Sequence, residues 1–232
     1  MRQVAIAAVS GLFVAACGSI TEPEDVLDCG AVEGLLACNT FEAEDPAWTT
    51  LVDGGVVVLD DSDASGGMKS LHATVAVGGG KAVRARSLGA SDRYYAKFHL
   101  NLPTGADATG MSILHLGEAV APFAGTNVEI AAGNLGVGVS TANVFDYPTP
   151  MPRDRWVCVE LELVASDTGG RVIVRADGAL VTDRTAIDTR PDGAFGDVEI
   201  GLSYVAAEAA SGTTVLVDDL VVASQPLPSC TR

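Results

Sequence analysis

Apolar and polar side chains alternate at every second residue along most of this chain, which is the periodicity of extended strands. The alternation is strongest over residues 156–163 (WVCVELEL), where every odd-numbered residue is Val or Leu. Turn-forming residues follow at 167–170 (DTGG) and 177–178 (DG), and an Asp-Gly pair favours a two-residue type I′ hairpin. Residues 156–183 are therefore predicted to form three antiparallel strands joined by two tight turns.

The predicted hairpins bring particular side chains together across the sheet. With a two-residue turn at Asp-Gly, Val174 is expected opposite Val181, and Arg175 is expected near Glu160 or Glu162. Opposite charges on facing strands stabilise a sheet by roughly 0.2–1 kcal/mol. This pairing gives both glutamates a structural role.

Further short apolar or alternating segments are separated by Gly, Asn, Asp and Pro. They are residues 56–59, 70–77, 81–88, 94–100, 111–116, 128–132, 135–140, 197–204 and 213–222. Residues 143–152 (NVFDYPTPMP) are expected to form a proline-rich loop. No window has the apolar spacing of a long amphipathic helix. About twelve short strands at regular spacing predict an all-β fold, a two-sheet antiparallel β-sandwich.

The last predicted strand, residues 213–222 (TTVLVDDLVV), contains two adjacent acidic residues. Both faces of this strand are otherwise apolar, with Asp218 on one face and Asp219 on the other. One aspartate is therefore expected to point into a packed layer. A buried carboxylate needs hydrogen bonds, a cation or a metal ion, so this strand indicates a site.

The overall charge limits the partners of the protein. The 232 residues include 30 acidic and 14 basic side chains, for a formal net charge of −16. Nucleic-acid binding needs a basic surface, and this composition excludes it. An acidic surface favours solubility and is compatible with divalent cations.

The first residues carry one positive charge followed by a short apolar run, as in the leader of an exported protein. The run ends in VAACG (14–18), which resembles the lipobox of bacterial lipoproteins, in which the cysteine is acylated and becomes the mature N-terminus. The resemblance implies a lipoprotein signal peptide at 1–16, an acidic tether at 17–28 and a β-sandwich domain at 29–232. It also implies that Cys17 carries the lipid and anchors the exported protein to a membrane. Gly after the cysteine resembles signals sorted to the outer membrane, on its periplasmic or surface face.

Export to an oxidising compartment predicts that the other four cysteines pair. Four cysteines allow three connectivities, which sequence does not distinguish. We favour Cys29–Cys38, which are nine residues apart, and Cys158–Cys230, which would tie the C-terminal tail to the sheet. A free, buried Cys158 is the alternative.

Several stretches, taken in order, resemble one family of exported bacterial proteins. They are FEAEDPAW, SGGMKSLHATV, YYAKFHLNLP, WVCVE and VDDLVV. Together they are similar to the concanavalin A-like lectin/glucanase (laminin G-like) jelly-roll domains over roughly residues 38–230. The resemblance implies a jelly-roll fold and speaks to architecture more than to activity.

The Phe-Glu opening and the Asp-Asp ending also resemble the family 4/9 carbohydrate-binding modules. In those modules a glutamate near the first strand and an aspartate in the last strand hold a structural Ca²⁺. The resemblance implies that Glu42 and Asp218 bind Ca²⁺ here, with Asp219 as a further candidate ligand. Ca²⁺ takes six to eight oxygen ligands, and the alternative is an aspartate satisfied by backbone N–H groups.

A sugar-binding site would need aromatic platforms close to amides and carboxylates. The candidate platforms are Trp48, Tyr95, Tyr147 and Tyr204. A glucanase of this superfamily would need a third carboxylate after Glu160 and Glu162, and the chain has none at that spacing.

A polysaccharide lyase is the catalytic alternative. Jelly-roll lyases need a base and a group that neutralises the uronate carboxylate. Tyr95, Lys97 and His99 share one predicted strand face, and Arg84, Arg86 or His115 could lie beside them. Alternating polar residues on a strand are also what a solvated face shows.

The sequence thus predicts a membrane-anchored lipoprotein with a non-catalytic glycan-binding or envelope-structural β-sandwich, with a polysaccharide as its possible ligand. The alternative is a polysaccharide lyase that acts on a uronate-containing glycan.

Overall fold

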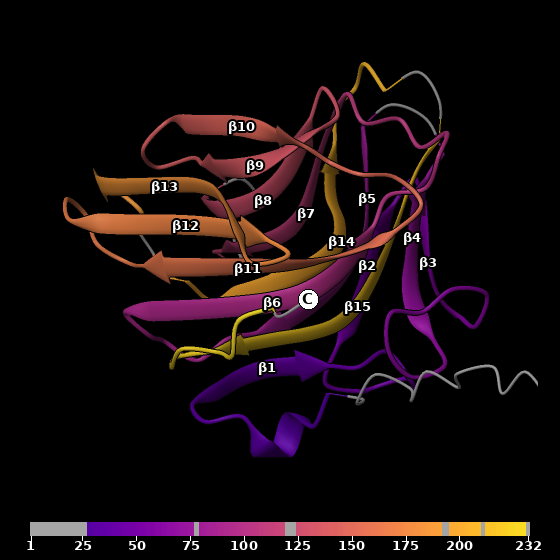
Figure 1. The fold of residues 1–232 in the computed structure, drawn as a ribbon, viewed down its shortest axis with the longest axis horizontal. Coiled ribbons are helices and arrows are strands. Elements are labelled where there is room, and N and C mark those ends of the chain that lie inside the picture. Colours follow the sequence, from indigo (N-terminus) through magenta and orange to yellow (C-terminus); the bar gives the residue numbers. More distant parts are fainter. Residues whose placement is uncertain (1–26, 77–78, 119–123, 192–194, 210–211, 231–232) are drawn as a thin grey trace, which may run out of the picture.

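The computed structural model describes residues 27–76, 79–118, 124–191, 195–209 and 212–230. These residues form two facing antiparallel sheets, with one short 3₁₀ helix, η1 (Cys29–Ala31) (Figure 1). The predicted all-β sandwich is confirmed. Among the described residues, no helix has the length and hydrophobicity needed to cross a bilayer. The predicted signal peptide, the lipidated Cys17 and most of the tether lie outside the described residues.

Sheet 1 has eight strands. In spatial order they are β13 (Ala179–Ile187), β12 (Gly170–Ala176), β11 (Trp156–Val164), β6 (Arg93–Asn101), β15 (Thr213–Ala223), β4 (Ser70–Val75) and β3 (Gly55–Asp60). The eighth, β1 (Leu35–Asn39), pairs with the second half of β15, whereas β4 pairs with its first half.

Sheet 2 has seven strands. In spatial order they are β10 (Val144–Pro150), β9 (Asn134–Val139), β8 (Gly125–Ala131), β7 (Gly110–Gly117), β14 (Asp197–Val205), β5 (Gly80–Ser87) and β2 (Thr49–Asp53). The inward faces of both sheets are aliphatic and enclose one hydrophobic core. Within it, the rings of Tyr94 and Phe195 pack edge to face with centroids 5.1 Å apart.

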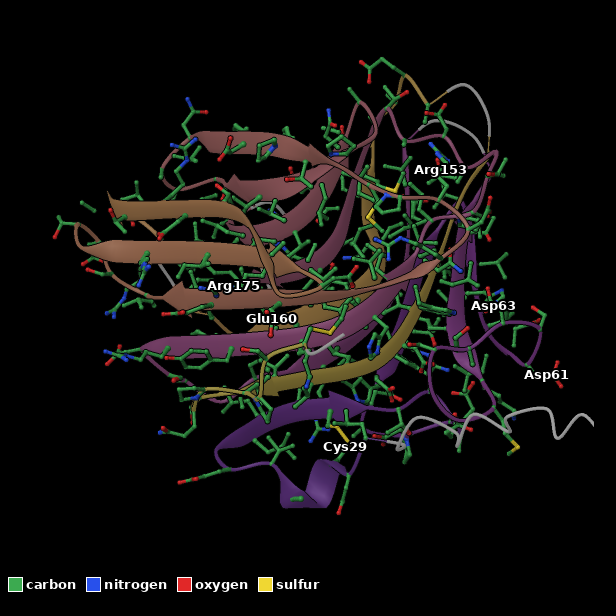
Figure 2. All side chains as sticks on the ribbon, in the orientation of Figure 1. Cys29, Asp61, Asp63, Arg153, Glu160 and Arg175 are labelled. Atoms are coloured by element: carbon green, nitrogen blue, oxygen red, sulfur yellow. A yellow bond between two sulfur atoms is a disulfide. The ribbon has the colours of Figure 1, made fainter. Side chains whose placement is uncertain are left out.

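The predicted hairpin of β12 and β13 is present. Asp177 and Gly178 have φ values of 49° and 74°, as a type I′ turn requires. Glu160 faces Arg175 across β11 and β12, as predicted (Figure 2). Val174, however, faces Thr182 and not Val181, because the register shifts between Val174 and Arg175 and leaves one extra residue on β13.

Three strands were not predicted: β1, β2 and β10. The expected loop at 143–152 contains β10, which forms the edge of sheet 2. Proline cannot donate a ladder hydrogen bond but is tolerated on an edge strand, so Pro148 and Pro150 do not prevent pairing. Phe145 therefore belongs to a strand with a defined outward direction and not to a loop.

A bulge in β15 determines where its two aspartates point. Asp219 has a φ of 52°, and the pairing with β6 shifts between Asp218 and Val221. Inward-facing residues are odd-numbered before the bulge (Val215 and Val217) and even-numbered after it (Leu220 and Val222). A carboxylate is buried, as expected, because Asp218 is fully buried. It lies against the loop at 61–69, however, and not between the two sheets.

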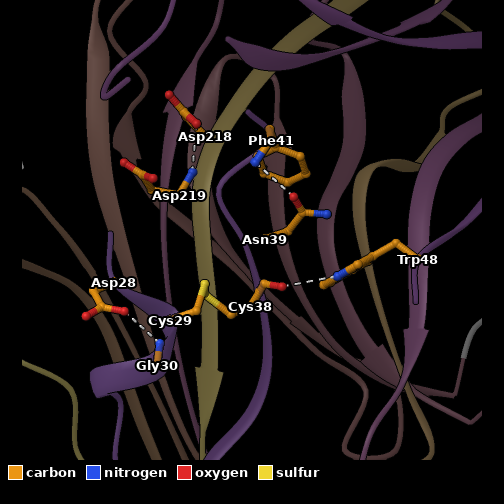
Figure 3. The surroundings of a disulfide bond; sticks show 9 residues. All are labelled: Asp28, Cys29, Gly30, Cys38, Asn39, Phe41, Trp48, Asp218 and Asp219. Atoms are coloured by element: carbon orange, nitrogen blue, oxygen red, sulfur yellow. Dashed lines mark hydrogen bonds between the residues drawn. A yellow bond between two sulfur atoms is a disulfide. The ribbon is translucent and has the colours of Figure 1, made fainter. Parts of the chain in front are cut away.

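Both favoured disulfides are present. Cys29–Cys38 ties η1 to β1 (Figure 3). Cys158–Cys230 ties the C-terminal tail, residues 224–230, to β11, and this tail lies over sheet 1 in Figure 1. The tail therefore covers part of the outer face of sheet 1.

Candidate functional site

The outer face of sheet 2 contains a depression of about 390 Å³, which we call the hollow. On β8, Val128 and Ile130 point into the core, so Asn127 and Glu129 point outward. On β9, the outward positions are Gly136 and Gly138, which carry no side chain. The hollow is lined by Ser112, Asn127, Glu129, Ser140, Phe145, Ser203 and Tyr204.

Two exposed aromatic rings flank the hollow. Phe145 of β10 is 57% exposed, and Tyr204 of β14 is 44% exposed. The strands that carry them are separated by β9, β8 and β7, which form the floor between the rings (Figure 1). Exposed rings above a polar floor are the arrangement that stacks on sugar rings and hydrogen-bonds their hydroxyls.

The floor is organised by Asn127. Its Oδ1 accepts hydrogen bonds from Ser112 Oγ (3.0 Å) and from His115 Nδ1 (2.7 Å). An amide oxygen only accepts, so His115 carries its proton on Nδ1, and burial lowers the pKa of this ring. Since Oδ1 receives both bonds, the Asn127 amide nitrogen remains available to donate to a ligand in the hollow.

Glu129 supplies the acidic group of the hollow. The Tyr147 hydroxyl donates a hydrogen bond to Glu129 Oε2. Burial raises the pKa of Glu129, and burial together with the adjacent carboxylate raises the pKa of Tyr147. A Cβ at Gly138 would lie 2.7 Å from both carboxylate oxygens, so glycine at this position makes room for the Glu129 side chain.

A charge pair lies near the hollow on the same sheet. The Lys81 ammonium contacts the Glu199 carboxylate, and both groups act electrostatically on His115. Asp197 adds a further negative charge in this region. The surroundings of the hollow are therefore acidic on balance.

Of the four predicted aromatic platforms, two lie on sheet 2 beside the hollow, Tyr95 lies on sheet 1 and Trp48 is buried. Tyr204 lines the hollow, and Tyr147 bonds to its carboxylate. Trp48 is only 3% exposed, and its Nε1 donates to the Cys38 carbonyl at 3.2 Å (Figure 3). Trp48 is therefore a core residue that offers no ring to a sugar, because the Phe-Glu…Trp segment folds back over β1.

The predicted lyase residues Tyr95, Lys97 and His99 share the outer face of sheet 1. The proposed companions do not join them, since Arg84, Arg86 and His115 belong to sheet 2. The Lys97 ammonium donates to the Pro228 carbonyl of the tail (3.2 Å), and His99 Nδ1 lies 3.7 Å from Asp219 Oδ2.

A second depression of about 300 Å³ lies beneath the tail. Its lining includes Tyr95, Lys97, Glu160, Glu162, Arg175 and Leu227. Glu160 Oε1 accepts from the Cys230 backbone N–H at 2.7 Å, and the two bases and two acids lie on neighbouring strands. On this charge-balanced face, Lys97 and Glu160 both hydrogen-bond to the backbone of the tail.

The candidate metal residues surround the loop at 61–69. Glu42 Oε1 accepts from the N–H groups of Met68 (2.8 Å) and Lys69 (3.2 Å). Asp218 Oδ2 accepts from the N–H groups of Ser65 (2.9 Å) and Gly66 (3.1 Å). Burial raises the pKa of Asp218 to about 7.

The fit of this region to Ca²⁺ depends on the close approach of the loop backbone. A Cβ at Gly66 would lie 2.8 Å from Asp219 Oδ2, and one at Gly67 would lie 1.9 Å from Glu42 Oε1. Two of the carboxylates thus form a cradle against bare backbone, beside the buried Asp218. In the described part of the chain, no three His, Cys, Asp or Glu side chains are grouped to hold a metal ion. Backbone carbonyls and water would have to complete the six to eight oxygens that Ca²⁺ needs.

Sequence reasoning found Tyr204 and missed the other six residues of the hollow: Ser112, Asn127, Glu129, Ser140, Phe145 and Ser203. The alternation in TNVEIA placed Asn127 and Glu129 on one face, and the glycines of LGVGV indicated an open strip beside them. These signals were present but ambiguous, because an outward polar pair is also what a solvated face shows. Phe145 was missed because its strand was predicted to be a loop.

Solved structures similar to this chain share its fold. The cellulose-induced protein Cip1 has a TM-score of 0.65 and 16% sequence identity, with 83% of this chain and 99% of that protein covered. The endo-β-1,4-glucuronan lyase from the fungus Trichoderma reesei has a TM-score of 0.61 and 14% identity, with 78% and 92% covered. The alginate lyase Aly36B has a TM-score of 0.51 and 10% identity, with 77% and 100% covered.

A scan of protein-family profiles finds no match to this sequence, and neither does a search of curated proteins. The structural likenesses confirm the expected concanavalin A-like jelly roll. At 10–16% identity they establish the fold alone.

Proposed function

We propose that this protein binds glycans in the hollow of sheet 2. The observation that carries the proposal is the pair of exposed rings, Phe145 and Tyr204, on either side of a floor that offers an amide donor and a carboxylate acceptor. Sugars are recognised by this combination of apolar ring faces and directed polar groups. The fold is shared with proteins whose names refer to cellulose, glucuronan and alginate, which is consistent with a carbohydrate ligand.

The chemistry of the hollow supports binding without catalysis. Elimination from a uronate needs a base and a group that neutralises the carboxylate. Tyr147 has a raised pKa and gives its hydrogen bond to Glu129, which makes its phenolate a rare species at neutral pH. His115 is 4% exposed and is held behind Asn127.

The lyase alternative on sheet 1 is supported less well. The tail engages Lys97, the only ammonium of the predicted trio, through the Pro228 carbonyl. The carboxylates Glu160 and Glu162 line the same depression and offset Lys97 and Arg175, so this face offers no excess positive charge to an anionic substrate. Formation of an unsaturated, ultraviolet-absorbing product from a polyuronate would nevertheless reveal lyase activity directly.

Export with a lipid anchor at Cys17 is part of the same proposal. The two disulfides support it, because disulfides persist in oxidising compartments outside the cytosol. An anchored protein would hold the hollow at a membrane surface, where extracellular or envelope glycans are within reach. Metabolic labelling with a fatty acid, compared between the wild-type chain and Cys17→Ala, tests this step.

We also propose that Glu42, Asp218 and Asp219 contribute to a structural Ca²⁺ site at the loop 61–69. The cradle formed around Gly66 and Gly67 supports it, as does the buried Asp218 carboxyl group, which lies beside Asp219 and has no cation among its described neighbours. Ca²⁺ would supply that positive charge and hold the loop against β15. The site lies on sheet 1 and takes no part in the hollow.

A glycan array probed with the purified protein tests the central proposal. We expect binding by the wild-type chain and at least tenfold weaker binding by Phe145→Ala and by Tyr204→Ala, because each removes a stacking surface. Leu180→Ala is the matched control, since Leu180 is equally exposed but lies on β13. Equal binding by all four proteins would place the site elsewhere, and binding by none would leave the sandwich a structural envelope protein.

A further inference from the structure

The lining of the hollow carries charge of one sign only. Among its described residues, Glu129 is the one with a carboxyl group and none is Lys, Arg or His; the others carry hydroxyl, amide or aromatic side chains. One of its oxygens accepts from Tyr147, and the carboxylate lies over Gly138 on the floor of the hollow. A ligand that enters the hollow therefore meets the carboxyl group of Glu129 and no basic side chain among the described lining residues.

Two cations in this part of the fold have carboxylate partners of their own. Lys81 of β5 is paired with Glu199. Arg184 of β13, next to the edge strand β10, is paired with Asp146 at 2.9 Å. Neither is available to neutralise an acidic ligand without first losing its partner.

The polar groups that do face the hollow suit hydroxyls. The Asn127 amide nitrogen is a donor, because both hydrogen bonds to Asn127 are accepted by its oxygen. The second oxygen of Glu129 is an acceptor. A donor and an acceptor on adjacent outward positions of one strand can engage neighbouring hydroxyls of a sugar ring.

We propose that the hollow selects uncharged, hydroxyl-rich glycans and rejects glycans that carry carboxylates. This inference rests on the proposed glycan-binding function and specifies its ligand class. It separates this protein from structural neighbours that are named as glucuronan and alginate lyases, whose substrates are polyuronates. A sugar carboxylate in the hollow would face the Glu129 carboxylate in partly desolvated surroundings, where like charges repel most strongly.

Two matched ligand pairs test the selectivity. Cellohexaose and a β-1,4-glucuronan hexamer share their linkage and differ in whether carbon 6 is an alcohol or a carboxylate. A β-1,4-mannan hexamer and a β-1,4-mannuronan hexamer form the second pair. For a pair that the protein binds, we expect calorimetry to give the uncharged oligosaccharide a Kd at least tenfold lower than that of the uronate. Tenfold in Kd corresponds to about 1.4 kcal/mol.

The variant Glu129→Gln tests whether the charge of Glu129 causes the preference for uncharged glycans. It removes the charge and keeps an acceptor, so the ratio of the affinities for the uncharged and the uronate member of a pair should fall toward one. The preference of the wild-type chain should also weaken at high ionic strength, because salt screens the repulsion. Glu162→Gln, on the outer face of sheet 1, is the matched control and should leave the preference unchanged.

The possible outcomes distinguish a failure of the charge selectivity from a failure of the proposed glycan binding. Equal or tighter binding of the uronates by the wild-type chain would overturn the selectivity and leave glycan binding intact. An unchanged preference in Glu129→Gln would also overturn it, because the charge would not be the cause. Binding of none of the four oligosaccharides would overturn the proposed function and the inference together.

Discussion

At the scale of single residues, the candidate site depends on outward strand positions that are glycine and therefore have no side chain. Gly136 lets the backbone of β10 approach β9, and Gly138 leaves the space that the Glu129 carboxylate fills. Alternation in the sequence predicts which residues point outward. It does not predict which outward residues converge, because the neighbours across the sheet depend on strand order.

Gly138→Ala tests the role of this opening. The added Cβ would meet both carboxylate oxygens at 2.7 Å, so Glu129 would have to move and its bond to Tyr147 would weaken. We expect at least a tenfold loss of glycan affinity and a loss of stability of about 1 kcal/mol, at the low end for overpacking. Gly89→Ala is the control, because the nearest atom to its added Cβ would be 3.6 Å away. Unchanged affinity in Gly138→Ala would separate Glu129 from binding.

His115 gives the protein a pH dependence of known sign. Burial lowers its pKa in the folded state below the usual value of 6.5. A group with a lowered pKa of this kind contributes stability that is complete above pH 6.5 and is lost as the pH falls further, because only the unfolded chain protonates freely.

Urea denaturation between about pH 7.5 and pH 5 measures this effect. The free energy of unfolding should fall on acidification, and it should fall less steeply in His115→Gln, which cannot take up the proton. Parallel pH profiles for the two proteins would show that His115 does not titrate as its burial requires.

At the scale of elements, two irregularities set the positions of candidate groups. The bulge at Asp219 reverses the inward and outward phase of β15, so the two aspartates approach the loop 61–69. The edge position of β10 makes a strand of a proline-rich segment and directs Phe145 toward the hollow. Strict alternation cannot anticipate a bulge, and proline counts cannot distinguish an edge strand from a loop.

The loop 61–69 should respond to Ca²⁺. A ligand present at 100 times its Kd stabilises the folded state by about 2.7 kcal/mol, which raises Tm by roughly 5–10 °C for a domain of this size. We expect such a rise on adding Ca²⁺ to the chelator-treated protein, and its loss in Glu42→Gln.

Glu33→Gln is the matched control for this shift, because Glu33 is an exposed carboxylate in the turn before β1. The same Tm with Ca²⁺ and with EDTA would mean that backbone N–H groups alone satisfy Glu42 and Asp218.

At the scale of the whole molecule, the sequence predicted the sandwich, the central hairpins and both disulfides. It did not predict which of the two outer faces is free of the C-terminal tail and so available to a ligand. The tail occupies one face because Cys230 bonds to Cys158 and Lys97 holds the Pro228 carbonyl, and these contacts join segments far apart in the chain. The other face retains its depression between Phe145 and Tyr204, outside the reach of the tail.

The two disulfides should differ in their effect on stability. Chain-entropy estimates rise with the length of the closed loop and give about 4 kcal/mol for the 72-residue separation and about 3 kcal/mol for the 9-residue separation. Denaturation should therefore show the larger loss for the Cys158→Ala/Cys230→Ala protein than for Cys29→Ala/Cys38→Ala. The reverse order would mean that the tail contributes little to the folded state.

The central claim is that glycans bind to the outer face of sheet 2. Nuclear magnetic resonance mapping tests this claim most directly. The ¹⁵N-labelled protein would be titrated with the uncharged oligosaccharide that it binds most tightly. Backbone amides of Asn127, Glu129, Phe145 and Tyr204 should shift together and saturate at one Kd. Shifts centred on Tyr95, Lys97 and His99, with sheet 2 unchanged, would contradict the account.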